Sequence, residues 1–289
     1  MEKVFLNDKL VDVDKAGISV TDGGFLYGAG LFETMRACNG VVFVIEDHLE
    51  RLFSSAHTLA IENSYDKKFI TEAVYKVLEA NKLSDARLRL TLSSGPMAAD
   101  GKERKSTLLI TATKFTPYPA EYYKNGVMVI ISAFKQNPFD PTFGHKTINY
   151  FPRIMALEQA RSKGAAESLW FTTDSRLAEG CISNVFLVKD SVLYTPPLTT
   201  PVLAGVARKT VCELAENNSI ELSEKDLYIN DVLEADEIFI TNVVMQIMPV
   251  VGVEKHTVGD GKVGPTVKKV QRSFAEFVEN ECEEYRSSD

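Results

Sequence analysis

The chain has 289 residues, 45% of them hydrophobic and 25% charged, the composition of an ordinary soluble globular protein with one large domain or two smaller ones. Its formal net charge of −8 at pH 7 argues against a nucleic-acid or anionic-membrane partner, because phosphate-rich surfaces recruit basic proteins. A small anionic ligand stays compatible with this charge, since one arginine in a cleft can override an acidic exterior.

The cysteines and histidines give little support to a metal site. Cys38, Cys181, Cys212 and Cys282 lie far apart without a Cys-x-x-Cys pair, and the chain has only four histidines. We therefore expect no metal, and free thiols in a reducing cytoplasm. The acidic N-terminal segment does not resemble a signal or transit peptide, and no window of about 20 apolar residues predicts a membrane helix.

Residues 1–115 predict a small mixed domain. Residues 4–13 alternate between apolar and polar side chains and predict a strand that breaks in a turn at Gly17. The Gly-rich segment 23–30 leads into strand-like residues, and Asn39-Gly40 predicts a hairpin between residues 32–37 and 41–45. From Asp47, a plausible N-cap, apolar residues follow helical spacing. A helix at about 67–81 and strands at 86–93 and 106–113 complete this domain.

A larger domain is expected after a proline-rich linker. Thr116-Pro117-Tyr118-Pro119 suits neither a helix nor a central strand, so we place the linker at 116–125 and the second domain at 126–289. Its predicted helices are 150–163, 205–217 and 265–284, and its predicted strands are 127–133, 168–172, 184–188 and 237–240. Strands and helices mixed in both halves favour an α+β fold over a doubly wound sheet.

Two segments near the N-terminus could bind phosphate, and each has a plainer interpretation. The Gly-rich segment 23–30 lacks P-loop spacing and leads into a strand, so a turn with positive-φ glycines is the better interpretation. His48 and Arg51 fall on the polar side of the helix that starts at Asp47. There Arg51 is either a solvated charge or a clamp for phosphate oxygens.

Three later segments could complete a site for a phosphate-bearing aldehyde cofactor. Lys146 follows a loop rich in proline and glycine and has apolar neighbours; a desolvated lysine is a usable amine, although most lysines lie on the surface. Glu179 precedes an apolar strand, in what is either a simple turn or a buried carboxylate beside a cation. Gly205 begins a helix whose first N–H groups either bind phosphate or only mark the helix start.

In this order and spacing, these segments resemble the class IV aminotransferase family, the fold-type IV enzymes that use pyridoxal 5′-phosphate (PLP). The resemblance runs from Phe25 to Pro265, nearly the whole chain. The matching segments are Tyr27-Gly28-x-Gly30-x-Phe32-Glu33, His48-Leu49-Glu50-Arg51-Leu52, Lys146-Thr147-Ile148-Asn149-Tyr150, Glu179-Gly180-x-x-Ser183-Asn184-x-Phe186, Leu203-x-Gly205-Val206-x-Arg208 and Gly259-Asp260-Gly261-Lys262-x-Gly264-Pro265. The resemblance implies a two-domain α+β fold with a small N-terminal α/β sandwich and a larger C-terminal β-barrel-like domain with surrounding helices.

The same resemblance implies roles for individual residues. Lys146 would hold PLP as a Schiff base and then move protons between the substrate carbon and the cofactor. Glu179 would keep the pyridine nitrogen protonated, so that the ring accepts electrons. Tyr150 would lie close to the phenolic oxygen of PLP. Tyr27 would line the substrate pocket near the partner subunit of the homodimer that is typical of the family.

The phosphate of PLP would be held by Arg51 and by the backbone amides of Val206 and Ala207. Relatives often place hydroxyl side chains at the positions of Ala207 and Val243, where this chain has none. More of the phosphate binding would then fall on Arg51, the backbone amides and Thr241 or Asn242. The resemblance therefore implies weaker retention of PLP, not its loss.

Three activities of the family compete. Aminodeoxychorismate lyase, which converts 4-amino-4-deoxychorismate to 4-aminobenzoate and pyruvate in folate biosynthesis, is the leading hypothesis. The segments 32–36, 241–242 and 247–250 resemble that group, as does the short Lys-Thr-x-Asn-Tyr spacing. In the lyase, Thr34 would assist protonation of the leaving group.

The alternatives are aminotransferases or a protein without catalysis. A branched-chain amino-acid aminotransferase would normally have Phe-Glu-Gly, a longer Lys-to-Tyr spacing and a Gly-Thr pair at 242–243, although Arg89 could match its carboxylate-binding arginine. A D-amino-acid aminotransferase ranks last, because residues 94–99 offer no Arg-x-His carboxylate trap. A non-catalytic PLP-binding paralogue is disfavoured because Lys146, Glu179 and Arg51 are all present.

Overall fold

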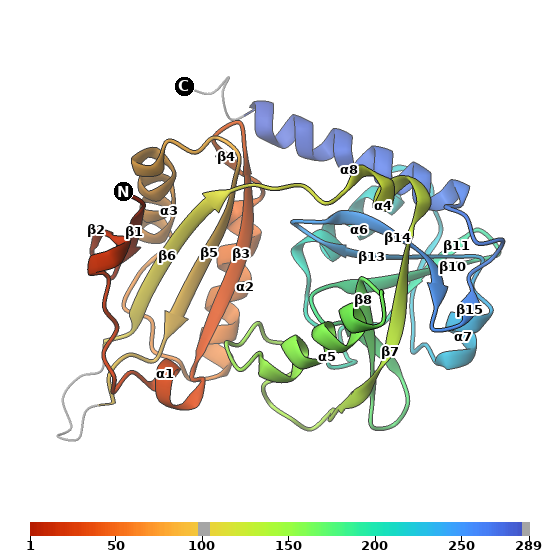
Figure 1. The fold of residues 1–289 in the computed structure, drawn as a ribbon, viewed down its shortest axis with the longest axis horizontal. Coiled ribbons are helices and arrows are strands. Elements are labelled where there is room, and N and C mark those ends of the chain that lie inside the picture. Colours follow the sequence, from red (N-terminus) through yellow and green to blue (C-terminus); the bar gives the residue numbers. More distant parts are fainter. Residues whose placement is uncertain (98–104, 285–289) are drawn as a thin grey trace. The chain divides into compact units, whose positions relative to one another are not determined.

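The computed structural model describes residues 1–97 and 105–284 and divides the chain into two compact units (Figure 1). The first unit comprises Met1–Thr116, His145–Asn149 and the end of the chain from Glu279; the second comprises Pro117–Gly144 and Tyr150–Val278. Both units combine a sheet with helices, which confirms the α+β prediction. Lys146, placed in the larger domain from the sequence, groups with the first unit. Each unit is described by itself.

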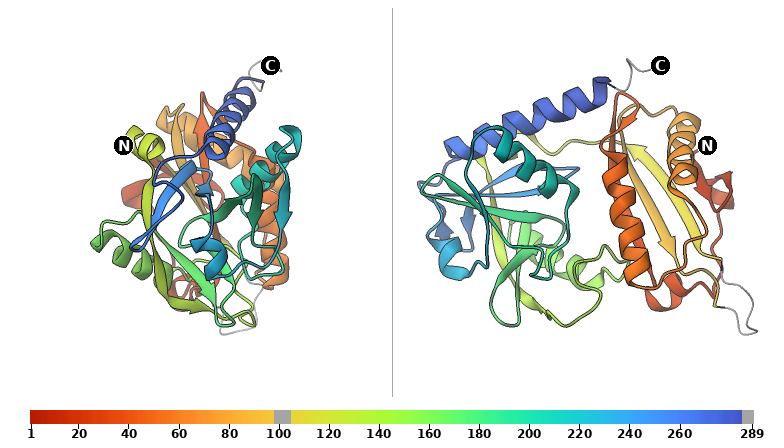
Figure 2. Two further views of the ribbon diagram at one scale, coloured as in Figure 1. Left: turned by 90° about the vertical axis from the view of Figure 1, so that its right-hand side faces the viewer. Right: turned by 180° about the vertical axis from the view of Figure 1, so that it is seen from behind.

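The first unit is an antiparallel sheet with two long helices on one of its faces, as the right panel of Figure 2 shows. The spatial order of the strands is β2-β1-β6-β5-β3-β4. These strands are β1 (Lys3–Leu6), β2 (Lys9–Asp12), β3 (Gly30–Cys38), β4 (Val41–Val42), β5 (Ala86–Ser93) and β6 (Thr107–Lys114). The helices are η1 (Val13–Lys15), α1 (Gly23–Tyr27), α2 (Ile45–Thr58) and α3 (Lys67–Asn81).

Alternation along the strands separates a buried face from a polar one. Leu88, Leu90 and Leu92 of β5 are fully buried in one hydrophobic cluster with residues of α2 and α3. The residues between them, Arg89 and Thr91, project to the opposite face, because successive side chains of a strand point to opposite sides. This polar face carries part of the candidate site.

Several local predictions for this unit are confirmed. Helix α3 has the predicted bounds, and so does β5. The hairpin at Asn39-Gly40 pairs Cys38 with Val41, and both turn residues have positive φ angles, 54° and 84°. That combination is the one an Asn-Gly hairpin turn requires.

Other local predictions are wrong. Residues 4–13 form the hairpin of β1 and β2 rather than one strand; the chain reverses at Asn7, whose φ of 62° asparagine tolerates better than most residues. The Gly-rich segment contains the short helix α1, capped by the carboxylate of Asp22, before the expected positive φ at Gly28. Helix α2 has Val44 rather than Asp47 as its N-cap, and Asp47 lies in the first turn.

The second unit is built on a nine-stranded mixed sheet of order β12-β11-β10-β13-β14-β7-β8-β9, with β15 paired to β14. Its strands are β7 (Val127–Gln136), β8 (Glu167–Thr172), β9 (Leu177–Gly180), β10 (Asn184–Lys189), β11 (Val192–Thr195), β12 (Leu222–Glu224), β13 (Glu237–Asn242), β14 (Gln246–Val253) and β15 (His256–Thr257). Its helices are α4 (Ala120–Asn125), α5 (Phe151–Ser162), α6 (Val206–Asn217), α7 (Ile229–Leu233) and α8 (Pro265–Glu284), the last ending among the residues of the first unit. Helix α4 occupies most of the predicted linker.

Helices α5 and α6 act as crossovers in this unit. Helix α5 joins the parallel strands β7 and β8, and α6 lies between the parallel strands β11 and β12 in the chain, as parallel pairs require. The core between strands includes Phe186 and Phe239, cross-strand partners whose rings stack with centroids 4.9 Å apart. Glu179 lies in β9, which pairs with β8 at one end of this sheet.

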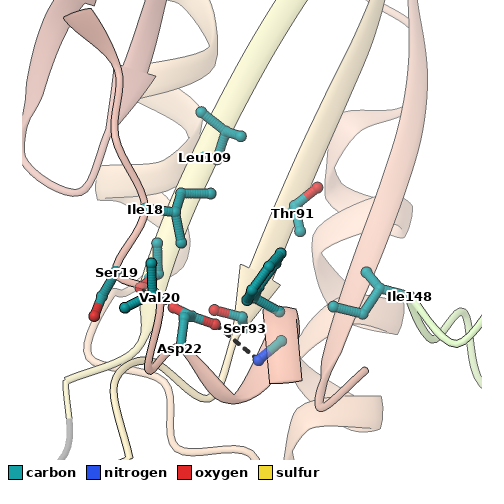
Figure 3. Close-up of a pocket in the computed structure, with 11 residues that line it drawn as sticks. Ile18, Ser19, Val20, Asp22, Thr91, Ser93, Leu109 and Ile148 are labelled. Atoms are coloured by element: carbon teal, nitrogen blue, oxygen red, sulfur yellow. Dashed lines mark hydrogen bonds between the residues drawn. The ribbon is translucent and has the colours of Figure 1, made fainter. Parts of the chain in front are cut away.

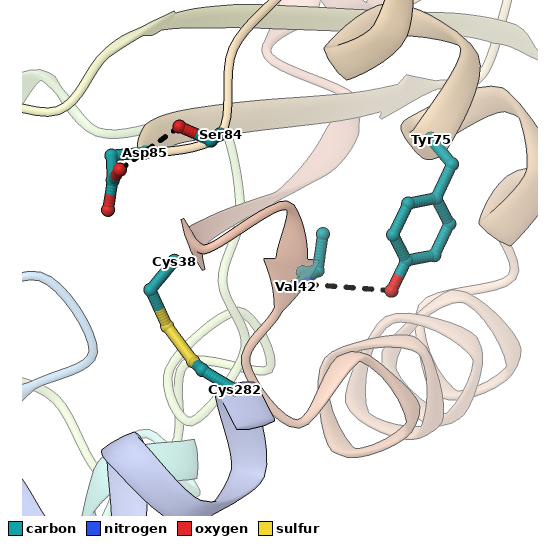
Figure 4. The surroundings of a disulfide bond; sticks show 6 residues. All are labelled: Cys38, Val42, Tyr75, Ser84, Asp85 and Cys282. Carbon is teal, nitrogen blue, oxygen red and sulfur yellow. Dashed lines mark hydrogen bonds between the residues drawn. A yellow bond between two sulfur atoms is a disulfide. The ribbon is translucent and has the colours of Figure 1, made fainter. Parts of the chain in front are cut away.

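Cys38 and Cys282 form a disulfide bond, with Cα atoms 5.9 Å apart (Figure 4). The prediction of free thiols is wrong for this pair, whereas Cys181 and Cys212 are free. The pairing joins residues 244 positions apart, so no local spacing could indicate it. Within the described ranges, no helix has the length and hydropathy to span a bilayer, and no group of three potential ligands is placed to bind a metal ion.

Candidate functional site

Lys146 lies on a short extended segment against the edge of β3. Its carbonyl accepts a hydrogen bond from Phe32 N–H at 2.9 Å, and Ile148 N–H donates to Gly30 O at 3.0 Å. A Cβ at Gly30 would lie 2.9 Å from the Ile148 side chain and 2.8 Å from a carbonyl of β5, so only glycine lets the segment approach so closely. The backbone on both sides of Lys146 is therefore fixed to the sheet.

The ring of Phe32 brings two cationic side chains together on the polar face of the sheet. Lys146 Nζ lies 4.7 Å from the ring centroid, and Arg89 Cζ lies 3.5 Å from it. Both distances are within the range of cation–π attraction. Thr34 is the cross-strand partner of Arg89. Two residues proposed from the sequence, Lys146 and Arg89, therefore lie against one aromatic ring whose role the sequence did not indicate.

On the other face of β3, Glu33 holds the guanidinium of Arg51. Arg51 Nε donates to Glu33 Oε1 at 2.8 Å, and Nη2 donates to Oε2. His48 Nδ1 lies 2.7 Å from the same Oε2. The prediction that His48 and Arg51 lie on the polar side of their helix is wrong, because His48 is fully buried and the side chain of Arg51 is only 11% exposed. The buried carboxylate of Glu33 offsets the cost of burying the Arg51 guanidinium and the His48 ring by accepting hydrogen bonds from both.

The charges in this cluster follow from burial and pairing. Burial alone would raise the pKa of Glu33, but Arg51 and His48 lower it to about 2. Burial lowers the pKa of His48, which therefore stays neutral at pH 7. Neutral His48 donates its Nδ1 proton to Glu33, and its Nε2 is buried without a hydrogen-bond partner among the described residues. The cluster is an ionised carboxylate that orients one arginine.

In the second unit, Glu179 is the last residue but one of β9, and its carboxylate accepts from three donors. Oε1 accepts from Gln136 Nε2 at 3.0 Å and from Arg153 Nη2 at 2.6 Å, while Oε2 accepts from Leu203 N–H at 2.9 Å. The side chain is 5% exposed. Glu179 is thus a buried and oriented carboxylate, the sharper of the two interpretations of its sequence.

The turn from Gly180 to Ser183 is held by a second buried acid, Glu167, which the sequence reasoning missed. Its Oε1 accepts from the N–H groups of Ser168 and Cys181, both at 2.9 Å, and its Oε2 accepts from Ile182 N–H at 3.1 Å and Ser183 Oγ at 3.0 Å. A glutamate at the start of the apolar stretch Ser168-Leu169-Trp170-Phe171 was the available signal, since charged residues are rarely buried without partners.

Two other predicted site residues bind the same turn. The Tyr150 hydroxyl donates to Cys181 O at 2.5 Å, and burial raises the pKa of Tyr150, so the hydroxyl keeps its proton. Asn242 donates to Ile182 O at 2.9 Å, while its own Oδ1 accepts from the N–H groups of Val244 and Met245. The side chain of Asn242 therefore organises the backbone around the turn.

The start of α6 presents its backbone without a side-chain cap. Gly205 is the N-cap, and Val206 and Ala207 are the first two helical residues. A Cβ at Gly205 would lie 1.9 Å from Asn184 Oδ1, so glycine is required there. In the same unit, Thr241 Oγ1 is buried and has no hydrogen-bond partner among the residues described.

Tyr27 lies at the end of α1, with 71% of its surface exposed. A pocket of about 260 Å³ lies near this helix, and its lining combines apolar side chains such as Ile18, Val20 and Ile148 with serine, threonine and aspartate side chains (Figure 3). The buried carboxylate of Asp22 at its floor is satisfied by Gly24 N–H and by Thr107 Oγ1. Of the residues 94–99 that were searched for an Arg-x-His trap, 98 and 99 lie outside the described residues.

Comparisons with known proteins agree with this arrangement. The sequence profile of the family described as amino-transferase class IV matches residues 30–253. A provisionally assigned branched-chain-amino-acid aminotransferase of Methanocaldococcus jannaschii is 34% identical over 281 residues, 95% of this chain and 96% of that protein. A D-alanine aminotransferase of Bacillus licheniformis is 29% identical over 283 residues, 96% of this chain and 98% of that protein.

The chain is also similar to solved structures of aminotransferases and of a lyase. The branched-chain amino acid aminotransferase of Escherichia coli has a TM-score of 0.89 at 28% identity, covering 95% of this chain and 94% of that one. A provisionally assigned 4-amino-4-deoxychorismate lyase of Legionella pneumophila has a TM-score of 0.84 at 25% identity, covering 92% of this chain and 97% of that one.

Proposed function

The chain belongs to the class IV aminotransferase family, whose members are PLP-dependent transaminases or lyases, and from that premise we propose that it is an amino-acid aminotransferase that transfers an amino group to a 2-oxo acid. The lyase activity, the leading hypothesis from the sequence, receives less support, because the relatives described above are mostly aminotransferases. We propose a branched-chain L-amino acid as the donor, in line with the relative at 34% identity.

The residues present fit PLP. The second unit offers a buried carboxylate for the ring nitrogen, backbone N–H groups at the uncapped start of α6, and the buried Thr241 hydroxyl without a partner among the described residues. Helix N-termini and hydroxyls are suitable partners for phosphate. The first unit offers the Lys146 amine and the oriented guanidinium of Arg51. The Thr241 hydroxyl partly compensates for the hydroxyls missing at Ala207 and Val243.

When bound, PLP supplies an aldehyde carbon that combines with amines and a ring that accepts electrons. Lys146 Nζ is the proposed attachment point and the group that later carries protons. Glu179 would hold the ring nitrogen, and Tyr150, whose hydroxyl proton is donated to Cys181 O, would lie close to the phenolic oxygen. Asn242 holds the backbone of residues 242–245 in place.

Arg51 is the proposed phosphate clamp of the first unit. A guanidinium has five N–H donors, and two of its three nitrogens donate to Glu33. Glu33 therefore sets the direction of the guanidinium. Variants in which Arg51 or Glu33 is replaced should bind PLP less tightly than the wild type.

The main support for an amino-acid substrate is that Arg89 and Lys146 both lie within cation–π range of the Phe32 ring. An amino acid and a 2-oxo acid both carry a carboxylate, and arginine is well suited to bind one. Arg89→Gln should raise KM for the amino donor by roughly 10- to 100-fold, the range expected for one charge-assisted hydrogen bond, with a smaller change in kcat. Arg87→Gln, on the same strand and the same face, is the matched control and should leave KM unchanged.

A half-reaction decides between the candidate activities. The PLP form of the protein is mixed with L-leucine, L-valine or D-alanine, and conversion to the amine form of the cofactor is followed by absorbance before 2-oxoglutarate is added. We expect conversion with the branched-chain donors and recovery with the 2-oxo acid. Conversion with D-alanine alone would instead assign a D-amino-acid enzyme. Formation of 4-aminobenzoate from 4-amino-4-deoxychorismate, without conversion by amino acids, would support the lyase.

We also propose a homodimer. Val20, Phe25 and Tyr27 are large, exposed side chains close together in the chain, and Val20 and Phe25 line the pocket near α1; Figure 3 labels Val20 there. Such groups are typical of surfaces that bind another protein. Light scattering should give twice the monomer mass, and Tyr27→Asp with Phe25→Asp should shift it toward the monomer. The cytoplasmic location expected from the sequence also stays a proposal, which cell fractionation tests.

A further inference from the structure

Arg153, in the first turn of α5, forms an ion pair with Glu179. Its Nη2 lies 2.6 Å from Glu179 Oε1, and its Nη1 donates to Gly180 O at 2.8 Å. The Arg153 side chain is only 14% exposed. One guanidinium therefore holds both the carboxylate of Glu179 and the backbone of the next residue.

This position is unfavourable for the helix itself. The N-terminus of a helix carries a partial positive charge, which repels a cation in the first turn. Tyr150, the N-cap, makes no side-chain cap, and the first turn contains no acidic residue. Burial alone would lower the pKa of Arg153, but the Glu179 carboxylate raises it. The compensation for this buried cation therefore comes from Glu179 and not from α5.

The guanidinium is also fixed from a second direction. Arg153 Cζ lies 5.1 Å from the ring centroid of the buried Trp170, within cation–π range. The other two donors on Glu179, from Gln136 and Leu203, are neutral. Arg153 thus supplies the one cation among the described donors to this carboxylate.

We propose that Arg153 is a positioning residue that pairs with the Glu179 carboxylate and orients it toward the pyridine nitrogen of PLP. The inference rests on the proposed function, because it requires PLP at Glu179. The ring nitrogen and the carboxylate compete for one proton, which stays on the stronger base of the two. A carboxylate beside a guanidinium is the weaker base, so the nitrogen keeps the proton and the ring stays a good electron acceptor.

Removing the cation reverses this preference. The buried carboxylate keeps only two neutral donors, and desolvation then strengthens it as a base. The N–H bond on the ring breaks, an O–H bond forms on Glu179, and both groups become neutral. A neutral ring withdraws electrons less strongly, so proton removal from the bound amino substrate slows while substrate binding changes little.

The test uses PLP labelled with ¹⁵N in the ring, bound to wild type, Arg153→Gln, Arg153→Lys and Arg161→Gln. Arg161 is the matched control, an exposed arginine of α5 paired with Glu158. The nitrogen chemical shift reports ring protonation, and the PLP dissociation constant, kcat and KM are measured alongside. We expect a protonated ring in wild type, Arg153→Lys and Arg161→Gln, and a neutral ring in Arg153→Gln. In Arg153→Gln, kcat should fall roughly 10- to 100-fold, the range for losing a charge-assisted hydrogen bond, with KM nearly unchanged.

The outcomes separate this role from a purely structural one. If Arg153 only braces the turn, Arg153→Gln will lower the melting temperature and PLP affinity but keep the protonated ring, and the inference is overturned. If Arg153→Gln does not fold, Arg153→Lys decides: a neutral ring overturns the inference, and a protonated ring supports it. Wild type that binds no PLP overturns the proposed function itself, whereas PLP-bound wild type with an unchanged Arg153→Gln overturns only the role of Arg153.

Discussion

Replacing Glu33 with glutamine tests the charge cluster that orients Arg51. The substitution preserves the shape of the side chain but removes the charge that faces Arg51 and His48. The buried Arg51 guanidinium then loses its counter-ion, and glutamine can accept on one oxygen only. We expect a less stable protein that also binds PLP less tightly, because Arg51 is no longer held in one direction.

The magnitude follows from the pKa of Glu33, which falls from an ordinary 4.5 to about 2 in the folded protein. One pKa unit corresponds to about 1.4 kcal/mol, so ionised Glu33 contributes about 3 kcal/mol to folding stability at pH 7. Because the folded pKa is the lower one, this contribution is present above pH 4.5 and is lost as the pH falls toward 2. About 1 kcal/mol should already be lost at pH 4. Breaking a buried ion pair typically costs about 3–5 kcal/mol, in agreement.

The assay is urea unfolding of the PLP-free protein at pH 7 and pH 4. Glu33→Gln should be less stable than wild type by about 3 kcal/mol at pH 7 and by about 2 kcal/mol at pH 4. The control is Glu50→Gln on α2, the helix that carries Arg51; the partner of Glu50 is Lys67, and its side chain is 74% exposed. Such a surface pair contributes less than about 1 kcal/mol. A Glu33→Gln variant within 1 kcal/mol of wild type, or with the same difference at both pH values, would refute the reasoning.

Three further predictions address other parts of the chain. Borohydride reduction followed by peptide mass spectrometry should place the cofactor on Lys146, and Lys146→Ala should lose both the label and activity, the latter by roughly a thousand-fold or more; a label on another lysine would contradict the assignment. Unreduced, denatured protein should titrate two thiols and reduced protein four, given the bond between Cys38 and Cys282; four thiols without reductant would disprove that bond. Glu167→Gln turns an N–H₂ group toward two donors and should destabilise the protein by about 2–4 kcal/mol in urea, and an unchanged midpoint would show that the turn does not depend on this acid.

The sequence predicted elements whose signals are local. Helix α3 has a regular apolar stripe and an aspartate cap, and its bounds were predicted correctly. The Asn39-Gly40 hairpin needs only two residues that accept positive φ angles. Strands such as β9 and β11 were not predicted because four residues are too few for a periodic pattern. Strand β14 contains Pro249 and Gly252, which read as breaks although the strand continues.

The residues of the candidate site that belong to sequence motifs could be predicted, whereas their partners outside the motifs could not. Lys146, Glu179 and Arg51 were found because they recur in a family pattern, and testing their roles is left to experiment. The burial of Arg51 was not predictable, because its partner Glu33 lies 18 residues earlier on a different element. Arg153 also gave no signal, since an arginine in a first helical turn normally faces solvent.

The segment that carries Lys146 has a second consequence for the chain. Strand β3 lies next to last in the sheet, and its outer neighbour β4 pairs with it only at Ala37 and Cys38, so the rest of that side is an edge. The hydrogen bonds of residues 146–148 cover the edge at Gly30 and Phe32. An uncovered edge strand is a template for pairing with other chains and hence for aggregation. A substitution that releases this segment should therefore increase aggregation during folding and also lower activity. The residues around Lys146 are thus constrained both by catalysis and by the need to cover this edge.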